Sequence, residues 1–399
     1  MTYSPAPAPS AAVKNVFLKM LPIALTVFVG FLTIGLPLPV LPLHLHYALG
    51  MSNLVVGIAI GSQFAAALLS RAWAGGRADT RGAKRAVVEG LVVAAISGVA
   101  YLASLAFIAT PAASLAVLLL GRVLLGLAES LVVTGALGWG IGLVGPQNAG
   151  KVMAWVGIAM YAAYATGAPV GALIYGRHGF IGIAAATIVI PLIALAVVAP
   201  ARAVAVMTAR RVPFYKVLGA VSLPGIGLAL CSVGFGVITT FIALLFAAKN
   251  WGSASLAFTA FGAAFIGARL MFAHLPDQIG GARVALVCVM IEAAGQLLIW
   301  QSAGVLTAYA GAALTGFGYS LAFPGFGVEA VRRAPPQSRG AAMGAFVAFL
   351  DLSLGITGPA AGAIASATSV NTVYLVASAT VALSSLIAAY LMANPPRTA

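Results

Sequence analysis

The chain has 399 residues, of which 62% are hydrophobic and only 7% are charged. Because an ordinary soluble domain carries about a quarter charged residues, this composition excludes a soluble globular protein. The formal charge of +14 at pH 7 is typical of nucleic-acid-binding proteins, but here the cations cluster in short segments between apolar stretches, as the positive-inside rule requires of membrane proteins. We therefore expect a lipid bilayer, and no nucleic acid, as a partner of this chain.

About twelve apolar stretches follow one another along the chain, each close to the ~20 residues that cross a bilayer as a helix. They are continuous rather than alternating, which argues against a β-barrel. The sequence therefore predicts an all-α membrane protein with twelve transmembrane helices, near residues 17–42, 54–74, 87–108, 112–136, 150–175, 179–200, 218–246, 254–274, 284–304, 306–329, 341–366 and 371–393.

The longest polar connector follows the sixth apolar stretch and divides the chain into two halves. With the N-terminus in the cytoplasm, all Lys and Arg residues except Arg122, Arg177 and Lys249 lie on the cytoplasmic side or at its edge, so both termini are expected there. The predicted organisation is a disordered tail over 1–15, a six-helix half over 16–200, a cytoplasmic linker over 201–217, a second six-helix half over 218–394 and a tail over 395–399.

An internal repeat supports this division. Residues Arg71, Asp79, Gly82 and Arg85 recur 198 positions later as Arg269, Asp277, Gly280 and Arg283. A second set, running from Gly121 to Pro169, recurs 190 positions later from Gly311 to Pro359. The repeat predicts two parallel six-helix bundles that are related by a pseudo-symmetry axis along the membrane normal.

Three motifs resemble those of the major facilitator superfamily. The stretch "GGRADTRGAKR" from Gly75 to Arg85 resembles the loop signature between its second and third helices, and "GRVLLGLAES" resembles its fourth-helix motif. The stretch "ATGAPVG" resembles the fifth-helix motif of the proton-driven antiporters, with Ala168 in place of the usual Gly. In detail the chain resembles the predicted sugar or drug efflux branch, which shares "LPLPVLPLH" in helix one. The resemblance implies a major facilitator fold and transport by alternating access.

The charged loop after the second helix has two interpretations. Lys and Arg alone hold a short loop in the cytoplasm, but this does not explain the aspartate or the glycine. An aspartate beside arginines forms charge-assisted pairs, and glycine permits a tight turn. We expect a conformational latch that closes the cytoplasmic side, formed by Arg71, Asp79, Gly82 and Arg85 and by the repeated Asp277 and Arg283.

Arg122 and Glu129 lie seven residues apart in the fourth helix, nearly two turns along one face. An ionisable group inside a membrane span is a functional candidate by default. Glu129 is the most accessible partner of Arg122. A proton that neutralises Glu129 would weaken its attraction for the guanidinium of Arg122, so we predict that this pair couples protons to substrate. The alternative is a structural pair that fixes helix four to its neighbours.

Asp351 lies in the middle of the eleventh helix and its repeat mate is Tyr161 in the fifth. In the resembled family these helices face the interface between the halves, so Asp351 is predicted to carry a proton or bind substrate there. The alternative is a pair with a basic group on the cytoplasmic side. The predicted substrate-binding residues are Arg122, Tyr161, Tyr164, Gln63, Thr134, Tyr319, Phe323 and Asp351.

Two further polar features have weaker functional interpretations. Glu292 in the ninth helix is assigned a local structural role, with Gln296 as a partner. His44 and His46 lack the companions of a metal site and serve either interfacial packing or a pH-sensitive gate.

The sequence contains no phosphate-binding P-loop and no nucleophile–base–acid set, so we expect neither an enzyme nor a cofactor or metal. The predicted function is proton-coupled export of a small organic compound by a monomer in the bacterial inner membrane. The alternative is uptake or facilitated diffusion of a small anionic metabolite with Arg122 as the anion site. A receptor or scaffold would require a sizeable soluble domain, which the sequence lacks.

Overall fold

The computed structural model describes residues 9–145, 148–204, 214–334 and 339–395. The helices are α1 (Pro9–Gly35), α2 (Leu41–Leu43), the π-helical turn η1 (His44–Ala48), α3 (Asn53–Arg81), α4 (Ala83–Ser104), the 3₁₀ turn η2 (Leu105–Phe107), α5 (Pro111–Val144), α6 (Ala149–Val198), α7 (Phe214–Ala248), α8 (Ser255–Phe272), α9 (Leu275–Gln278), α10 (Gly281–Trp300), α11 (Val305–Arg333), α12 (Arg339–Ala367) and α13 (Val370–Ala393). Within these residues the chain is helical and contains no strand, which confirms the predicted all-α fold.

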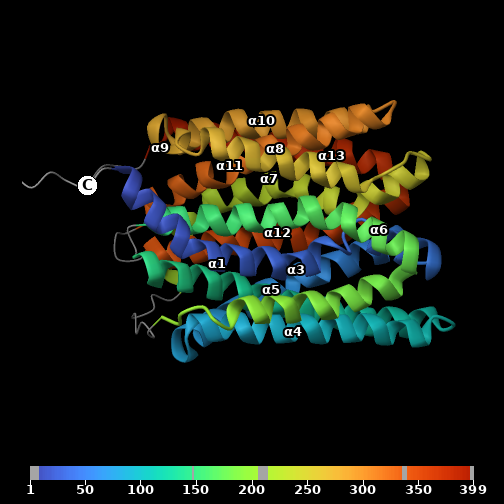
Figure 1. The fold of residues 1–399 in the computed structure, drawn as a ribbon. Coiled ribbons are helices and arrows are strands. Elements are labelled where there is room, and N and C mark those ends of the chain that lie inside the picture. The colour runs from blue at the N-terminus through green and yellow to red at the C-terminus, as the bar shows by residue number, and fades with distance from the viewer. Residues whose placement is uncertain (1–8, 146–147, 205–213, 335–338, 396–399) are drawn as a thin grey trace, which may run out of the picture.

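The long helices lie side by side with their axes aligned along the length of the bundle (Figure 1). α1, α3, α4 and α5 make one pass each and α6 makes two, because its 50 residues contain a break at Gly179, where φ is 61°. α7, α8, α10, α11, α12 and α13 make one pass each. The described helices therefore form the two sets of six that the sequence predicts.

The predicted ends of the halves differ from the observed helices. α1 includes residues from Pro9 onward, which lie inside the expected tail of 1–15. α7 begins at Phe214, so the last four residues of the expected linker 201–217 are helical. Residues 1–8, most of the linker from 205 to 213, and the tail residues 396–399 lie outside the described residues.

Gly82 and Gly280 confirm the internal repeat in three dimensions. Each precedes the first residue of a long helix, with φ of 98° at Gly82 and 96° at Gly280 and ψ of 139° at both. A side chain at such a positive φ is sterically unfavourable, so glycine is required at both corners. The turn that the sequence predicts at Gly82 is therefore present in both halves.

The two halves meet where α3 packs against α12 and α6 packs against α8. A Cβ added to Gly57 would lie 2.0 Å from the carbonyl oxygen of Gly358, and one added to Gly262 would lie 2.5 Å from the Cβ of Ala165. Gly57 lies in the first turns of α3 and Gly358 near the end of α12, so this close approach lies at the end of the bundle away from the chain termini.

We expect the substitution Gly57→Ala to lower the apparent melting temperature of the purified protein. The added methyl group must push α3 from α12, and overpacking of this kind costs about 1–3 kcal/mol. Gly267→Ala in α8 is the matched control, because nothing lies within 4 Å of a Cβ there. Alanine favours a helix over glycine by about 1 kcal/mol, so the control should melt at the same or a higher temperature. Equal melting of the two variants would contradict this packing.

His44 and His46 differ in their surroundings. His44 is 3% exposed, its ring stacks on Phe180 with centroids 4.0 Å apart, and its Nε2 has no hydrogen-bond partner. Nδ1 of His46 lies 2.9 Å from the carbonyl oxygen of Met51. Burial lowers the pKa of His44 to about 4, so this ring packs as a neutral group at pH 7.

The pH dependence of this packing has a definite sign. Because the pKa of His44 is lower in the folded chain than the ordinary 6.5, the stability that its neutral ring contributes is complete above pH 6.5 and is lost as the pH falls toward 4. His44→Phe keeps an aromatic ring without a titratable group. Between pH 7.5 and about 5, the apparent melting temperature of the natural chain should fall further than that of the variant, and parallel curves would count against this effect.

Candidate functional site

An ion pair joins the two halves near the middle of the bundle. Both Nε and one terminal nitrogen of Arg71 in α3 lie 2.5 Å from Oδ2 of Asp351 in α12. The side chain of Asp351 is 4% exposed and that of Arg71 is 18% exposed. An arginine side chain in a helix leans toward the helix N-terminus, which carries this guanidinium from its own position in α3 back to the level of Asp351.

The pair combines two residues to which the sequence analysis gave separate roles. Arg71 was assigned to a cytoplasmic latch and Asp351 to the central cavity, and the structure brings them together. The basic partner considered for Asp351 is therefore an arginine of the other half. Such a pair is strong because both groups are charged and largely removed from water.

Glu129 has an amide partner rather than a cation. Its Oε2 accepts a hydrogen bond of 2.7 Å from Nε2 of Gln63 in α3, and both side chains are buried. Gln63 precedes Arg71 by eight residues, roughly 12 Å along the same helix. A buried carboxyl group that is held by a neutral amide is not locked in the charged form by a cation, so it is suited to gaining and losing a proton.

Arg122 does not pair with Glu129, which corrects the expected contact. Its Nε and one terminal nitrogen donate to the carbonyl oxygens of Ala59 and Ile60, each at 3.1 Å, and its other terminal nitrogen lies 3.5 Å from the hydroxyl oxygen of Tyr101. The physical reason is that α3 offers these carbonyl oxygens to the guanidinium directly, while Gln63 takes the carboxylate. Arg122 is 1% exposed and joins α5 to α3 and α4 without Glu129.

Six aromatic side chains from both halves form a cluster, hereafter the aromatic cluster. The rings of Tyr161 and Phe265 are stacked with centroids 3.8 Å apart, and those of Phe235 and Tyr319 are stacked at 5.7 Å. The rings of Tyr161 and Tyr319 lie 6.1 Å apart. Three members were predicted from the sequence and the three phenylalanines were not; the full set is Tyr161, Tyr164, Phe235, Phe261, Phe265 and Tyr319.

The repeat contained a signal for two members of this cluster. Phe261 stands 198 positions after Gln63, and Tyr319 stands 190 positions after Glu129. The amide and carboxyl group of the first half are thus replaced by two rings in the second half, and these rings lie in contact, with centroids 6.4 Å apart.

Arg269, the repeat mate of Arg71, lies beside the aromatic cluster. Its guanidinium carbon is 5.0 Å from the ring centroid of Phe265, and one terminal nitrogen donates to the carbonyl oxygen of Ser320 at 2.5 Å. Where Arg71 meets Asp351 across the halves, Arg269 lies over a ring that stacks on Tyr161, the repeat mate of Asp351. The α3–α12 contact therefore contains an ion pair, and at the equivalent place the α6–α8 contact contains stacked rings.

Two predicted substrate-binding residues lie apart from the aromatic cluster. Thr134 is partly buried in α5, five residues beyond Glu129. The ring of Phe323 in α11 is 5.5 Å from that of Phe346 in α12. Thr134 follows Glu129 in α5 and Phe323 follows Tyr319 in α11, so both lie nearer the C-terminal ends of these helices.

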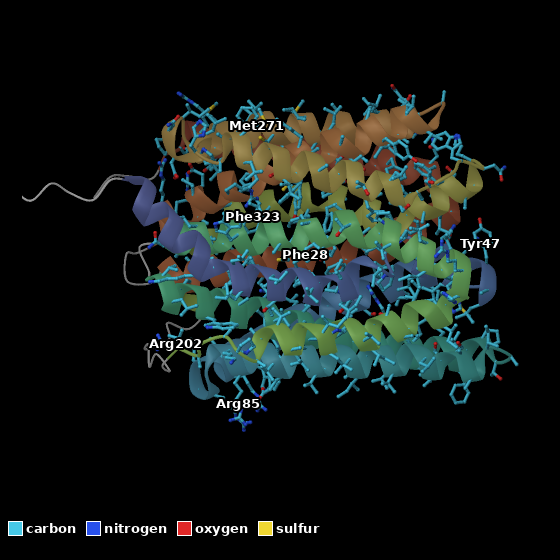
Figure 2. The ribbon with its side chains drawn as sticks, in the orientation of Figure 1. Phe28, Tyr47, Arg85, Arg202, Met271 and Phe323 are labelled. Atoms are coloured by element: carbon cyan, nitrogen blue, oxygen red, sulfur yellow. The ribbon has the colours of Figure 1, made fainter. Side chains whose placement is uncertain are left out.

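The predicted latch residues are dispersed. Arg85 lies at the end of the bundle that carries the termini, opposite Tyr47 (Figure 2), and its Nε is 3.4 Å from Oε1 of Glu89. Arg77 donates to the same carboxylate at 2.6 Å. Glu89 was not among the expected residues, although its position four residues after Arg85 on a helix was a usable signal.

The remaining latch residues are exposed. Asp79 lies in the last turn of α3, and Asp277 lies in the short helix α9. Arg283 makes no ion pair with Asp277 or with any other carboxylate of the described residues. Gly280 turns the chain between α9 and α10. The role of Asp277 and Arg283 in a latch between the halves stays a prediction.

Comparisons with known proteins agree with this fold. The sequence profile of the Major Facilitator Superfamily matches residues 23–222 and 224–399. An uncharacterized MFS-type transporter of Pseudomonas aeruginosa (strain LESB58) is 46% identical over 371 residues, which cover 93% of this chain and 92% of the relative. Another from Burkholderia mallei (strain SAVP1) is 46% identical over 390 residues, which cover 96% and 94%.

Two solved structures share the arrangement of helices. A variant of the nucleoside transporter NupG matches with a TM-score of 0.76 at 16% identity and covers 94% of this chain and 99% of its own. The human organic anion transporter MFSD10 matches with a TM-score of 0.68 at 15% identity and covers 96% and 100%. At such low identity these likenesses show the fold alone. Together with the profile and the relatives, they show that the chain belongs to the major facilitator superfamily of secondary transporters.

Proposed function

We propose that this transporter exports a small organic compound in exchange for protons, as in the drug and sugar efflux branch of the superfamily. The observation that carries the proposal is the ion pair between Arg71 and Asp351, because it is a titratable contact between the two halves that must move apart in alternating access. The proposed location is the bacterial inner membrane, with both termini in the cytoplasm. The proposed transporter is a monomer with two halves over residues 16–200 and 218–394.

The conformation described is closed at the end away from the termini, where Gly57 approaches Gly358. In the proposed orientation that end faces the periplasm, so the substrate enters from the cytoplasm. Arg85, which lies at that cytoplasmic end, and the other latch residues would then be used in the opposite, outward-facing conformation.

A proton acts on the contact between the halves by neutralising Asp351. A neutral carboxylic acid holds the guanidinium of Arg71 less strongly, and removing one charge of a buried pair costs about 3–5 kcal/mol. The α3–α12 contact then loses its ionic component, whereas the α6–α8 contact, built from the stacked rings of Tyr161 and Phe265, does not titrate. Protonation therefore favours separation on one side of the interface.

Glu129 is the second proposed proton carrier. Its amide partner Gln63 lies on the same helix as Arg71, so a change at Glu129 reaches the ion pair through α3. The aromatic cluster lines the other side of the interface and is suited to a substrate with a planar or apolar face, since such rings bind by stacking and burial. We propose that a proton on Glu129 and the substrate bind in alternation.

No observation favours the alternative of anion uptake through Arg122. The guanidinium is 1% exposed and donates to two backbone carbonyl oxygens and toward a phenol. A counterflow assay at equal pH on both sides, repeated with an imposed pH gradient, separates the two functions, because a uniporter does not respond to the gradient.

One prediction of the proposed function concerns the stability of the ion pair. Asp351→Asn leaves Arg71 charged and without its partner, so the apparent melting temperature should fall. Arg71→Gln combined with Asp351→Asn removes both charges and should recover much of that loss, because the larger part of it is the uncompensated charge. Melting curves of the two single variants and the double variant form the cycle. A double variant that is destabilised by the sum of the single effects would contradict a direct pair.

Another prediction of the proposed function concerns proton coupling at Glu129. A ligand is first chosen with a thermal-shift panel of radiolabelled sugars, nucleosides and planar aromatic compounds. In proteoliposomes, Glu129→Gln should reduce transport driven by a pH gradient by about tenfold, within the range of ordinary coupling free energies, while ligand exchange at equal pH continues.

Glu292→Gln is the matched control for this experiment. Glu292 is also a fully buried carboxyl group in a membrane helix, but it packs inside the second half against Gly234 and has no hydrogen-bond partner in the described residues. The control should keep the response to the pH gradient. Full gradient-driven transport by Glu129→Gln would remove that residue from the proposed mechanism.

A further inference from the structure

An apolar groove of about 460 Å³ lies on the second half, where α8, α9, α10, α11 and α13 meet. Arg283, in the first turn of α10, is the charged side chain among its lining residues. The apolar lining extends along α10 from Arg283 to Ile291, roughly 12 Å along the helix axis. The lining side chains include Phe272, Ile279, Val287 and Met392.

The pseudo-symmetry of the chain shows what Arg283 lacks. Its repeat mate Arg85 lies 3.4 Å from Glu89, four residues later on the same helix. The residue 198 positions after Glu89 is Val287, which is 60% exposed and lines the groove. The second half thus keeps the arginine but replaces its carboxylate partner with an apolar side chain.

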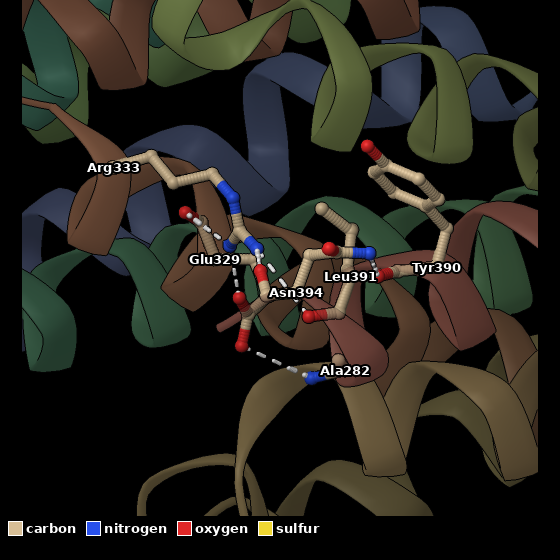
Figure 3. Close-up of polar contacts among 6 residues, drawn as sticks. All are labelled: Ala282, Glu329, Arg333, Tyr390, Leu391 and Asn394. Atoms are coloured by element: carbon tan, nitrogen blue, oxygen red, sulfur yellow. Dashed lines mark hydrogen bonds and ion pairs between the residues drawn. The ribbon is translucent and has the colours of Figure 1, made fainter. Parts of the chain in front are cut away.

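The acid that reaches the start of α10 is engaged elsewhere. Glu329 of α11 pairs with Arg333 and accepts a hydrogen bond of 3.3 Å from the backbone N–H of Ala282 (Figure 3). Arg333 also donates to the carbonyl oxygen of Asn394 at 2.7 Å, which fixes the end of α13. Glu329 and Arg333 together therefore join the ends of α10, α11 and α13, and Arg283 has no ion-pair partner among the described residues.

We propose that this groove binds an anionic phospholipid, with an acyl chain in the groove and the lipid phosphate on Arg283. Val287, Ile279 and Met392 of the lining are exposed, so the groove opens on the outside of the second half. Arg283 lies in the first turn of α10, next to α9, and α9 lies at the end of the bundle that carries the C-terminus (Figure 1). In the proposed orientation this is the cytoplasmic end, where lipid headgroups are expected. The phosphate supplies the negative charge that Glu89 supplies in the first half. The apolar lining matches a hydrocarbon chain, and the unpaired cation selects an anionic headgroup.

The test is native mass spectrometry of the full chain, purified in detergent, with phosphatidylglycerol or phosphatidylcholine of identical acyl chains. We expect the chain to retain phosphatidylglycerol in preference to phosphatidylcholine. Arg283→Gln should lower the retention of phosphatidylglycerol about fivefold, the effect of one basic side chain near a membrane surface. Arg177→Gln, which removes an exposed cation of the first half, is the matched control and should change nothing.

The variant Val287→Glu tests the proposal through the repeat. It restores in the second half the i,i+4 carboxylate that Arg85 has in Glu89, so Arg283 should pair internally and phosphatidylglycerol should be lost about as strongly as in Arg283→Gln. Ile291→Trp fills the groove with Arg283 intact and should also lower retention. Equal retention of the two lipids by the natural chain, or unchanged retention of phosphatidylglycerol in Arg283→Gln and Val287→Glu, would overturn the proposal.

Discussion

The ion pair between Arg71 and Asp351 is the interaction on which the arrangement of the two halves depends. Among the described residues it is the salt bridge that joins α3 of one half to α12 of the other, and Asp351 is almost fully shielded from water. In a medium of low dielectric constant each charge is tolerable mainly because the other is present. The ion pair and the close packing near Gly57 lie in the same contact between α3 and α12.

The two halves differ at equivalent positions of the interface between them. Asp351 and Tyr161 occupy equivalent positions, as do Arg71 and Arg269, yet only the first half's arginine faces a carboxylate. One contact between the halves is therefore an ion pair, and the other includes stacked rings. In the proposed function, a proton acts on the ion pair and the substrate acts on the rings, so proton binding and ring packing are separated across a single interface.

The sequence was sufficient for the helices, the repeat and the corners at Gly82 and Gly280, because apolar length and glycine chemistry are local properties. It also identified Glu129, Asp351, Tyr161 and Tyr319, which do lie at or near the interface between the halves. The predicted partners of the charged side chains were less often correct. The spacing of Arg122 and Glu129 placed them on one helix face, but spacing says nothing about the carbonyl oxygens and the amide that α3 brings to that face. The phenylalanines of the aromatic cluster were missed because phenylalanine is common in any membrane span.

At two positions where the first half pairs an arginine with an acid, the equivalent arginine of the second half has no ion-pair partner among the described residues. Arg283 shows this at the surface, where Val287 replaces the mate of Glu89. Arg269 shows it in the interior, since the carbonyl oxygen of Ser320 and the ring of Phe265 orient its guanidinium without cancelling its charge. In the proposed function, a ligand beside the aromatic cluster would have the Arg269 cation on the α8 side and the carboxyl group of Glu129 on the α5 side. These two groups would orient the bound molecule over the apolar rings, and a proton on Glu129 would change the charge on one side alone.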